Sequence, residues 1–290
     1  MRSLSFVIVL SIFCNVANGS EQQKNDSEQQ QIVSKDWDAQ AYKDASFLQF
    51  EVGMKVIKSI QWQGNEAVLE IGCGDGKITH EIAKLVPQGS VHGIHFSPNL
   101  ITYCCKTYAE HENMSFVQAD IVQFVTAQKF NKVLSFASLD WVENKKQAFE
   151  SIANACAPDA YVHLYVTDRD NPYLKARFAM LTSDKWKQFF EDYVIPFFPY
   201  TKQGLRTYIY NAGLRTTALK KEKQTHIFLT REDFIKWLFV IPVQYERIPE
   251  DRRIEFFNDM IDLYIQDVPA DEDGAITLVN NRIRATATKD

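Results

Sequence analysis

A short apolar strand that runs directly into three closely spaced glycines constrains this sequence more than any other feature. Residues 67–71, AVLEI, form the expected strand, and Gly72, Gly74 and Gly76 follow with one residue between neighbours. Residues 77–85 then have the periodicity of a helix. Glycine permits a sharp turn and a close approach of the backbone to a ligand. The pattern therefore predicts a strand–turn–helix unit with a ligand site at the turn.

The same alternation of strands and helices continues for about another ninety residues. Further strands are expected at residues 90–95, 115–118, 133–136 and 160–166, with helices that include 97–109 and 144–155. Ser97 and Pro98 predict a helix start, because serine is a favoured N-cap and proline suits the first helical position. Alternation on this scale predicts an α/β fold whose parallel sheet is covered by helices on both faces.

The rest of the chain has a different pattern. Residues 171–200 are rich in large apolar side chains and are expected to form a helical cover over the carboxyl end of the sheet. Additional helices are expected at residues 37–60, 201–212, 230–237 and 250–266, with a sixth strand within 214–228 and a seventh, edge strand at 276–287.

The acidic residue before the glycines indicates which ligand the turn would bind. Glu70 lies two residues before Gly72, and the spacing is GxGxG. Dinucleotide-binding folds use GxGxxG, whose helix faces a pyrophosphate. A carboxylate suits a cationic ammonium group better than a phosphate, and S-adenosylmethionine (SAM) has an amino group and no phosphate. The turn therefore favours SAM over the nicotinamide cofactor of an oxidoreductase; a tight turn without a ligand is the other alternative.

Four segments resemble the motifs of the class I SAM-dependent methyltransferases. They are VLEIGCGDGKIT, GIHFSPNLI, QADIVQF and VLSFASLDWVEN. Within that family the chain resembles the trans-aconitate and juvenile hormone acid methyltransferase type, through Tyr42, Ser46, Gln49 and Trp141. The resemblance covers roughly residues 33–288. It implies a Rossmann-like, seven-stranded class I methyltransferase sheet, mostly parallel with an antiparallel last strand, and a helical cap.

The resemblance also implies a role for each matching residue. Gly72, Gly74 and Gly76 would cradle the methionine part of SAM, and Glu70 would organise that loop and the amino group. The other cofactor contacts would come from His95, from Asp120 to the adenine amine, from the backbone of Ile121, and from Ser138 or Leu139. Gln49 and Trp141 would hold a substrate carboxylate, and the alternatives for them are a surface glutamine and a core tryptophan.

Three residues depart from the family pattern. His95 stands where the family has an acid that accepts hydrogen bonds from both ribose hydroxyls, and a neutral imidazole has one acceptor nitrogen. It is either the ribose partner in a weakened site or a sign that the site is unused. Lys132 stands where an acid is expected, and Asp140 where His or Gln is expected before the tryptophan.

The chemistry that the resemblance implies is methylation of the carboxylate of a small organic acid. A carboxylate is ionised near neutral pH, so no residue is expected to act by acid–base catalysis. The cysteines lack the spacing of a metal site, and no metal is expected. The alternative function is a secreted, catalytically weakened methyltransferase-like binding protein.

The ends and the charge of the chain limit its location and partners. Residues 1–19 have the pattern of a signal peptide and residues 20–32 that of a polar linker, so the methyltransferase domain is expected at 33–290. The protein would be secreted or periplasmic, or cytoplasmic if the start is misassigned. A net charge of −5 disfavours partners such as nucleic acid and anionic membranes. After signal removal we expect a monomer that acts on a small-molecule carboxylic acid and binds no membrane.

Overall fold

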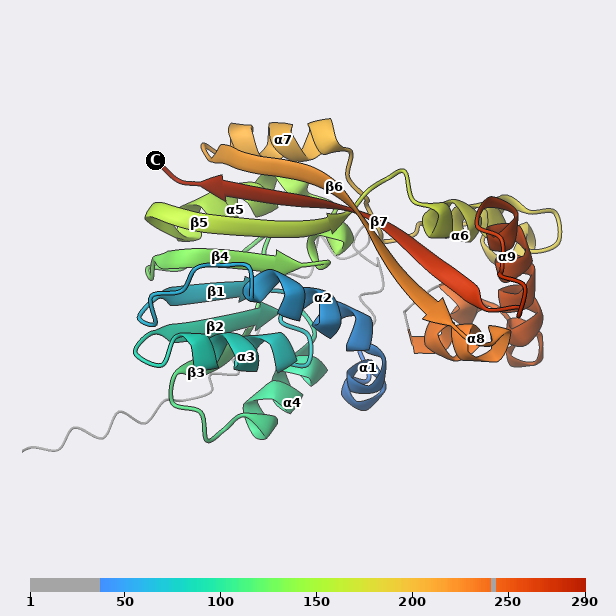
Figure 1. Cartoon of the computed structure of the whole chain (residues 1–290), viewed down its shortest axis with the longest axis horizontal. Helices are drawn as coiled ribbons and strands as arrows, with labels where there is room; N and C mark the ends of the chain where they lie inside the picture. The colour runs from blue at the N-terminus through green and yellow to red at the C-terminus, as the bar shows by residue number, and fades with distance from the viewer. Residues whose placement is uncertain (1–36, 241–243) are drawn as a thin grey trace, which may run out of the picture.

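A seven-stranded sheet forms the centre of the structure, a computed structural model that describes residues 37–240 and 244–290 (Figure 1). The strands are β1 (Ala67–Ile71), β2 (Ser90–His95), β3 (Met114–Gln118), β4 (Phe130–Phe136), β5 (Cys156–Thr167), β6 (Arg215–Phe228) and β7 (Ile276–Thr288). Their order is β3-β2-β1-β4-β5-β7-β6. β1 to β5 pair in parallel, whereas β7 is antiparallel to both β5 and β6. The expected mostly parallel, seven-stranded class I sheet is confirmed.

The last strand of the chain lies inside the sheet. β7 pairs with β5 on one side and with β6 on the other, so β6 is the edge strand. The prediction of an edge strand at residues 276–287 is therefore wrong. An alternating pattern reports which face of a strand is buried, but it carries no information about how many neighbours the strand has.

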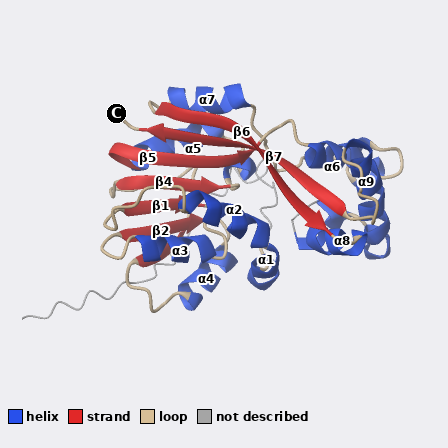
Figure 2. Ribbon diagram, viewed as in Figure 1, coloured by secondary structure: helices blue, strands red, loops and turns tan. Residues whose placement is uncertain are grey.

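Helices cover both faces of the sheet, as Figure 2 shows. Helices α2 (Phe47–Ile57) and α3 (Lys77–Leu85) pack on one face, where Val68, Val91 and Leu134 belong to their apolar cluster. Helices α5 (Lys145–Ala155) and α7 (Lys202–Asn211) pack on the other face around Leu69 and Val133. Adjacent residues of one strand thus pack into apolar clusters on opposite faces of the sheet. Because both faces are buried, the central strands are continuous runs of apolar residues.

Local signals set the starts of several helices. Helix α4 (Pro98–Thr107) begins as expected, with the Leu100 amide donating to Ser97 Oγ at 3.3 Å. Helix α8 (Arg231–Val240) follows Thr230, whose Oγ accepts from the Asp233 amide at 3.1 Å. The single helix expected over residues 37–60 is two helices, α1 (Ala39–Ala45) and α2, which meet at Ser46, where ψ is 8° instead of a helical value.

A cap lobe stands beyond the carboxyl end of the sheet. It consists of α6 (Pro172–Thr182), α8, α9 (Arg253–Asp267) and the far ends of β6 and β7, which share an apolar cluster of their own (Figure 1). Only the first part of residues 171–200 is the expected helical cover; a short 3₁₀ turn, Lys187–Phe189, and irregular chain follow α6.

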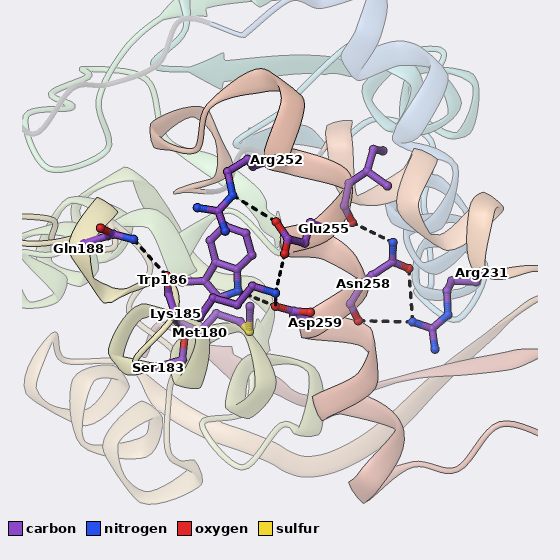
Figure 3. Close-up of polar contacts among 11 residues, drawn as sticks. Met180, Ser183, Lys185, Trp186, Gln188, Arg231, Arg252, Glu255, Asn258 and Asp259 are labelled. Atoms are coloured by element: carbon purple, nitrogen blue, oxygen red, sulfur yellow. Dashed lines mark hydrogen bonds and ion pairs between the residues drawn. The ribbon is translucent and has the colours of Figure 1, made fainter.

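Polar contacts fasten the segment after α6 to α9, as Figure 3 shows. Trp186 Nε1 donates to Asp259 Oδ2 at 2.8 Å, and Lys185 Nζ lies 2.6 Å from the same oxygen. Lys185 also pairs with Glu255 at 2.8 Å. Trp186 itself is 1% exposed, so the segment is both packed and hydrogen-bonded onto the cap.

Part of the sequence lies outside the described residues, including the expected signal peptide 1–19, the expected linker 20–32 and residues 33–36. Within residues 37–240 and 244–290, every helix is too short or too polar to cross a lipid bilayer.

Candidate active site

The glycine turn joins β1 to α3 at the carboxyl edge of the sheet. Gly72, Gly74 and Gly76 have φ angles of 76°, 58° and 77°, which favour glycine. The amide of Gly72 donates to the carbonyl of Ile94 at 2.8 Å and so ties the turn to β2. The predicted strand–turn–helix unit is present with its glycines in the conformation that only glycine adopts readily.

The surroundings of the turn leave no space for side chains. A Cβ atom on Gly72 would lie 2.1 Å from Ser138 Cβ, and one on Gly74 would lie 2.9 Å from the ring of Tyr42. Ser138 Oγ donates to the carbonyl of Ile71 at 2.8 Å, so this contact is fixed by a hydrogen bond. Packing within the protein therefore requires these glycines, in addition to any ligand.

Glu70 lies directly beneath the turn. Its side chain is 1% exposed, and Oε2 accepts a 2.6 Å hydrogen bond from Thr79 Oγ1 on α3. Burial raises the pKa of Glu70 to about 8, against the hydrogen bond from Thr79, and the nearby Asp75 adds to the rise. A cation placed beside this carboxyl group would favour its ionised form.

A polar network links the amino-terminal helices to the turn. Ser46 Oγ donates to Asp75 Oδ2 at 2.8 Å, and Lys77 Nζ lies 3.0 Å from the same oxygen. Lys77 Nζ also donates to the carbonyl of Lys43 at 2.6 Å. Ser46 was noted in the sequence only as part of the resemblance, and the structure gives it this bridging contact.

Thiols pack under the same turn. Cys73 and Cys104 belong to one buried cluster, and Cys104 Sγ donates to the carbonyl of Gly74 at 3.3 Å. Burial and the neighbouring Cys104 raise the pKa of Cys73, so it is present as a thiol. Cys105 and Cys156 also form no disulfide among the described residues. Cys73, Cys104 and Cys156 are buried and serve as small apolar side chains in the core.

His95 stands at the carboxyl end of β2, as expected for a ribose partner. It is 8% exposed, its ring stacks on Phe96, and Nδ1 accepts a 3.1 Å hydrogen bond from the amide of Ser97. A neutral imidazole with an accepting Nδ1 carries its proton on Nε2. The single acceptor nitrogen is thus used within the protein, and His95 can offer a ligand only a donor.

The remaining expected cofactor contacts follow β3 and β4. Asp120 is exposed, and its Oδ1 accepts from the amide of Val122 at 2.9 Å, which fixes the carboxylate after β3. Ile121 is 5% exposed. Leu139 is 0% exposed within the apolar core that α5 and α7 cover, and its carbonyl accepts from the Tyr200 hydroxyl at 3.3 Å.

A cavity of about 90 Å³, which opens to solvent, lies between the sheet and the cap lobe. Both expected substrate residues line it: Gln49 from α2 and Trp141 from the 3₁₀ turn Leu139–Trp141. Gln49 Oε1 is buried without a hydrogen-bond partner among the described residues. Trp141 packs edge-on against Trp37 and Phe197, with ring centroids 5.9 and 5.0 Å apart. The structure thus brings together two residues that are far apart in the sequence.

The two other departures from the family pattern have structural roles. Asp140 is fully buried and accepts from the amide and the hydroxyl of Thr167, each at 2.9 Å, with Arg282 at 3.8 Å. Burial raises the pKa of Asp140, and Arg282 and Thr167 oppose the rise. Lys132 pairs with Glu66 at 3.4 Å. Asp140 therefore ties the 3₁₀ turn to β5, and Lys132 neutralises a buried acid.

Sequence reasoning missed three polar residues of the cap lobe that line the cavity. Tyr173 and Arg177 are one turn apart on α6, and Trp237 lies on α8. Their side chains are 5%, 1% and 6% exposed. An arginine within the apolar segment PYLKARFAM, four residues after a tyrosine, was the available signal, because residues four apart share a helix face.

Comparison with known proteins gives a family and a fold. Residues 63–211, about half of the chain, match the family described as a methyltransferase domain. A protein of Invertebrate iridescent virus 6 with the provisional name methyltransferase 235L is 27% identical over 228 residues, which cover 79% of this chain and 85% of the viral protein. The juvenile hormone acid O-methyltransferase of Drosophila melanogaster is 26% identical over 223 residues, covering 71% and 74%.

Solved structures agree on the fold. A methyltransferase-like protein of Bacillus halodurans C-125 superposes with a TM-score of 0.61 at 15% identity, over 82% of this chain and 99% of its own. Coclaurine N-methyltransferase, solved with N-methylheliamine and S-adenosylhomocysteine (SAH), superposes with a TM-score of 0.56 at 15% identity, over 83% and 72%. At this level of identity the likeness concerns the fold.

Proposed function

The chain belongs to the class I SAM-dependent methyltransferases, and we propose that it transfers the methyl group of SAM to the carboxylate of a small organic acid. One observation carries the proposal: Gln49 and Trp141 line the same cavity. Ala137 also lines it, and the next residue, Ser138, contacts Gly72 of the glycine turn. A side-chain amide and an indole N–H can both donate to a carboxylate. The relative from Drosophila melanogaster is named for methylation of an acid.

The residues at the carboxyl edge of β1 to β3 fit SAM. Glu70 offers a buried carboxyl group whose pKa, raised to about 8 by burial, would fall beside an ammonium group. Asp120 is exposed at the end of β3 and can accept from an amine. His95, between them in the sheet order, would present Nε2–H to a ribose oxygen.

The proposed chemistry asks little of the protein beyond placement. SAM supplies an electrophilic methyl group on a sulfonium sulfur. The acceptor carboxylate is already ionised at neutral pH, so no residue need remove a proton. Among the described residues that line the cavity, only Asp140 has a carboxyl group. That carboxyl group already accepts hydrogen bonds from Thr167 and lies 3.8 Å from Arg282. The cavity walls would exclude water and hold the carboxylate oxygen in line with the methyl group.

Methyl transfer from labelled SAM to a panel of small carboxylic acids tests the proposal. We expect methyl esters from one or more acids and none from the matched primary amides. Gln49→Leu and Trp141→Phe should each raise KM for the acid about tenfold, since a hydrogen bond to a charged group contributes roughly 1.5 kcal/mol or more. Both should leave the Kd of SAM unchanged, and Gln203→Leu, at an exposed position on α7, serves as the control. SAM binding without ester formation from any acid would refute the proposal.

A second candidate is a secreted methyltransferase-like protein that has lost activity and serves as a binding module. His95 favours it, because its one acceptor nitrogen is bonded to Ser97. Calorimetry with SAM and SAH tests cofactor use, and absence of binding at millimolar ligand would favour this candidate. Export rests on the leader-like residues 1–19, and a mature amino terminus at Ser20 is the expected result of sequencing the exported protein.

A further inference from the structure

The cavity has two walls that come from different parts of the fold. One wall, next to the glycine turn, includes Gln49, Ala137 and Trp141. The other wall belongs to the cap lobe and includes Arg177 and Trp237. In Figure 1 the arrows of β4 and β5 point from the sheet toward the cap lobe. A ligand that fills the cavity therefore touches residues of both walls.

The cap wall carries a cluster of buried hydrogen-bond donors. Arg177 is 1% exposed, and its guanidinium lies 5.4 Å from the ring centroid of Phe197, which also packs on Trp141. The hydroxyl of Tyr173 and Nε1 of Trp237 are buried without hydrogen-bond partners among the described residues, and their rings are in edge contact at 5.8 Å. Buried donors normally have partners, so these two point to a ligand with acceptor atoms.

The charge of Arg177 specifies the kind of acceptor. Burial lowers the pKa of Arg177, and the phenols of Tyr173 and Tyr193 oppose the shift. The surroundings thus disfavour the cation on balance. An anionic group in the cavity would form charge-assisted hydrogen bonds with this cation, which are stronger than the hydrogen bonds that a neutral ligand could accept from it.

An anion bound by Arg177 would have to be a group other than the carboxylate that reacts. In methyl transfer a carboxylate oxygen forms a bond to the methyl carbon, the carbon–sulfur bond breaks, and its electron pair stays on sulfur. The carboxylate becomes a neutral ester. A guanidinium on the reacting group would stabilise the substrate more than the transition state and would slow the reaction. A guanidinium bound to a second anion, one that does not react, stays paired in the substrate, the transition state and the product.

We propose that the acid methylated by this protein carries a second anionic group, which Arg177 binds together with Tyr173 and Trp237. The inference rests on the proposed carboxyl methylation, and it adds the substrate class: an acid with two anionic ends and a less polar body between them. Gln49 and Trp141 would face the end that is methylated, and the cap wall would face the end that is not.

Kinetics with paired substrates test the proposal. The substrates are straight-chain α,ω-dicarboxylic acids of increasing length and the monoamide of each, which keeps the shape and loses one charge. We expect a KM about tenfold or more lower for the diacid of best length than for its monoamide, with similar kcat, because the contact is equal in substrate and transition state. A monoamide that equals or exceeds its diacid at every length would overturn the proposal.

Variants assign the effect to the cap wall. Arg177→Gln should raise KM for the diacid about tenfold or more, leave kcat nearly unchanged and abolish the preference over the monoamide. Tyr173→Phe, which removes one oxygen, should give a smaller rise and guards against misfolding of the arginine variant. Lys175→Gln on the same helix is the control, because Lys175 is exposed and pairs with Asp267 at the surface. A loss of kcat on monoamides as well as diacids in Arg177→Gln would show that Arg177 holds the reacting group and would overturn the proposal.

Direct binding separates this inference from the proposed function. Calorimetric titration of the intact protein with the diacid and its monoamide requires no methyl transfer. If no acid yields an ester but the diacid binds through Arg177, the proposed function fails and the anion site stands. If esters form from monoacids and diacids bind no better, the function stands and the anion site fails.

Discussion

Replacing His95 by aspartate should strengthen SAM binding. In the wild type, Nδ1 of His95 accepts from the amide of Ser97 at 3.1 Å, and the neutral ring offers a donor on Nε2. An aspartate can keep the Ser97 contact with one oxygen, which takes the position of Nδ1, and use the other to accept from a ribose hydroxyl. The change therefore adds a charged acceptor without removing the bond that holds the end of β2.

The size of the effect follows from two opposing contributions. A hydrogen bond to a charged group contributes about 1.5–3 kcal/mol. His95 is 8% exposed, so the carboxylate loses part of its hydration, and the net gain should be about 1–2 kcal/mol. That gain corresponds to a Kd roughly five to thirty times lower.

Isothermal titration calorimetry with SAM and with SAH measures the change, since both ligands share the ribose. His95→Asn is the matched control, because it keeps the shape and the Ser97 contact and adds no charge; its Kd should stay within about threefold of the wild type. An equal or higher Kd for His95→Asp, in a variant with unchanged thermal stability, would show that His95 does not face the ribose.

Two further predictions concern the glycine turn and the carboxyl group beneath it. Gly72→Ala should lower the free energy of unfolding by about 3 kcal/mol or more, because the added Cβ would lie 2.1 Å from Ser138. The control is Gly213→Ala, where φ is a similar 77° but the space is open, and it should lower the free energy of unfolding by only about 1–2 kcal/mol. Equal losses for the two variants in denaturant unfolding would refute the packing argument. Burial raises the pKa of Glu70 in the folded state to about 8 from its ordinary value of 4.5, so the native state binds the extra proton and wild-type stability should fall from about pH 4.5 to pH 8. Glu70→Gln should remove this pH dependence, which amounts to about 3–5 kcal/mol in the free energy of unfolding between pH 4.5 and pH 8. If the free energy of unfolding falls equally steeply with pH in the wild type and in Glu70→Gln, the pH dependence does not come from Glu70.

The cofactor half of the site could be predicted because its signals are local. Residues 67–85 contain the strand, the three glycines and the helix in one stretch, and backbone conformation there depends mainly on neighbours in sequence. Ser97 as an N-cap was readable for the same reason. The close contact between Gly72 and Ser138 was not, since it joins two segments that only the sheet brings together.

The substrate half could be predicted only in part. Gln49 and Trp141 were expected from the resemblance, but the cavity that unites them also draws on α6, α8 and β7. Arg177 lies on the buried face of α6, where periodicity predicts an apolar residue, and no local rule says whether such an arginine is buried or bends to the surface. The place of β7 inside the sheet was missed because strand order depends on long-range pairing.

The two halves of the site therefore give different kinds of evidence. The glycines of the turn are required by contacts with Ser138 and Tyr42, so they would be needed for the fold even in a chain with no turnover. The cap wall gives evidence of another kind. A buried guanidinium costs free energy, and an apolar side chain of similar volume often serves a core equally well or better. Arg177 lies in the cavity beside two buried donors, the hydroxyl of Tyr173 and Nε1 of Trp237, which have no hydrogen-bond partner among the described residues. Buried donors normally have partners, so the cap wall bears on the proposed acid site more directly than the glycine turn does.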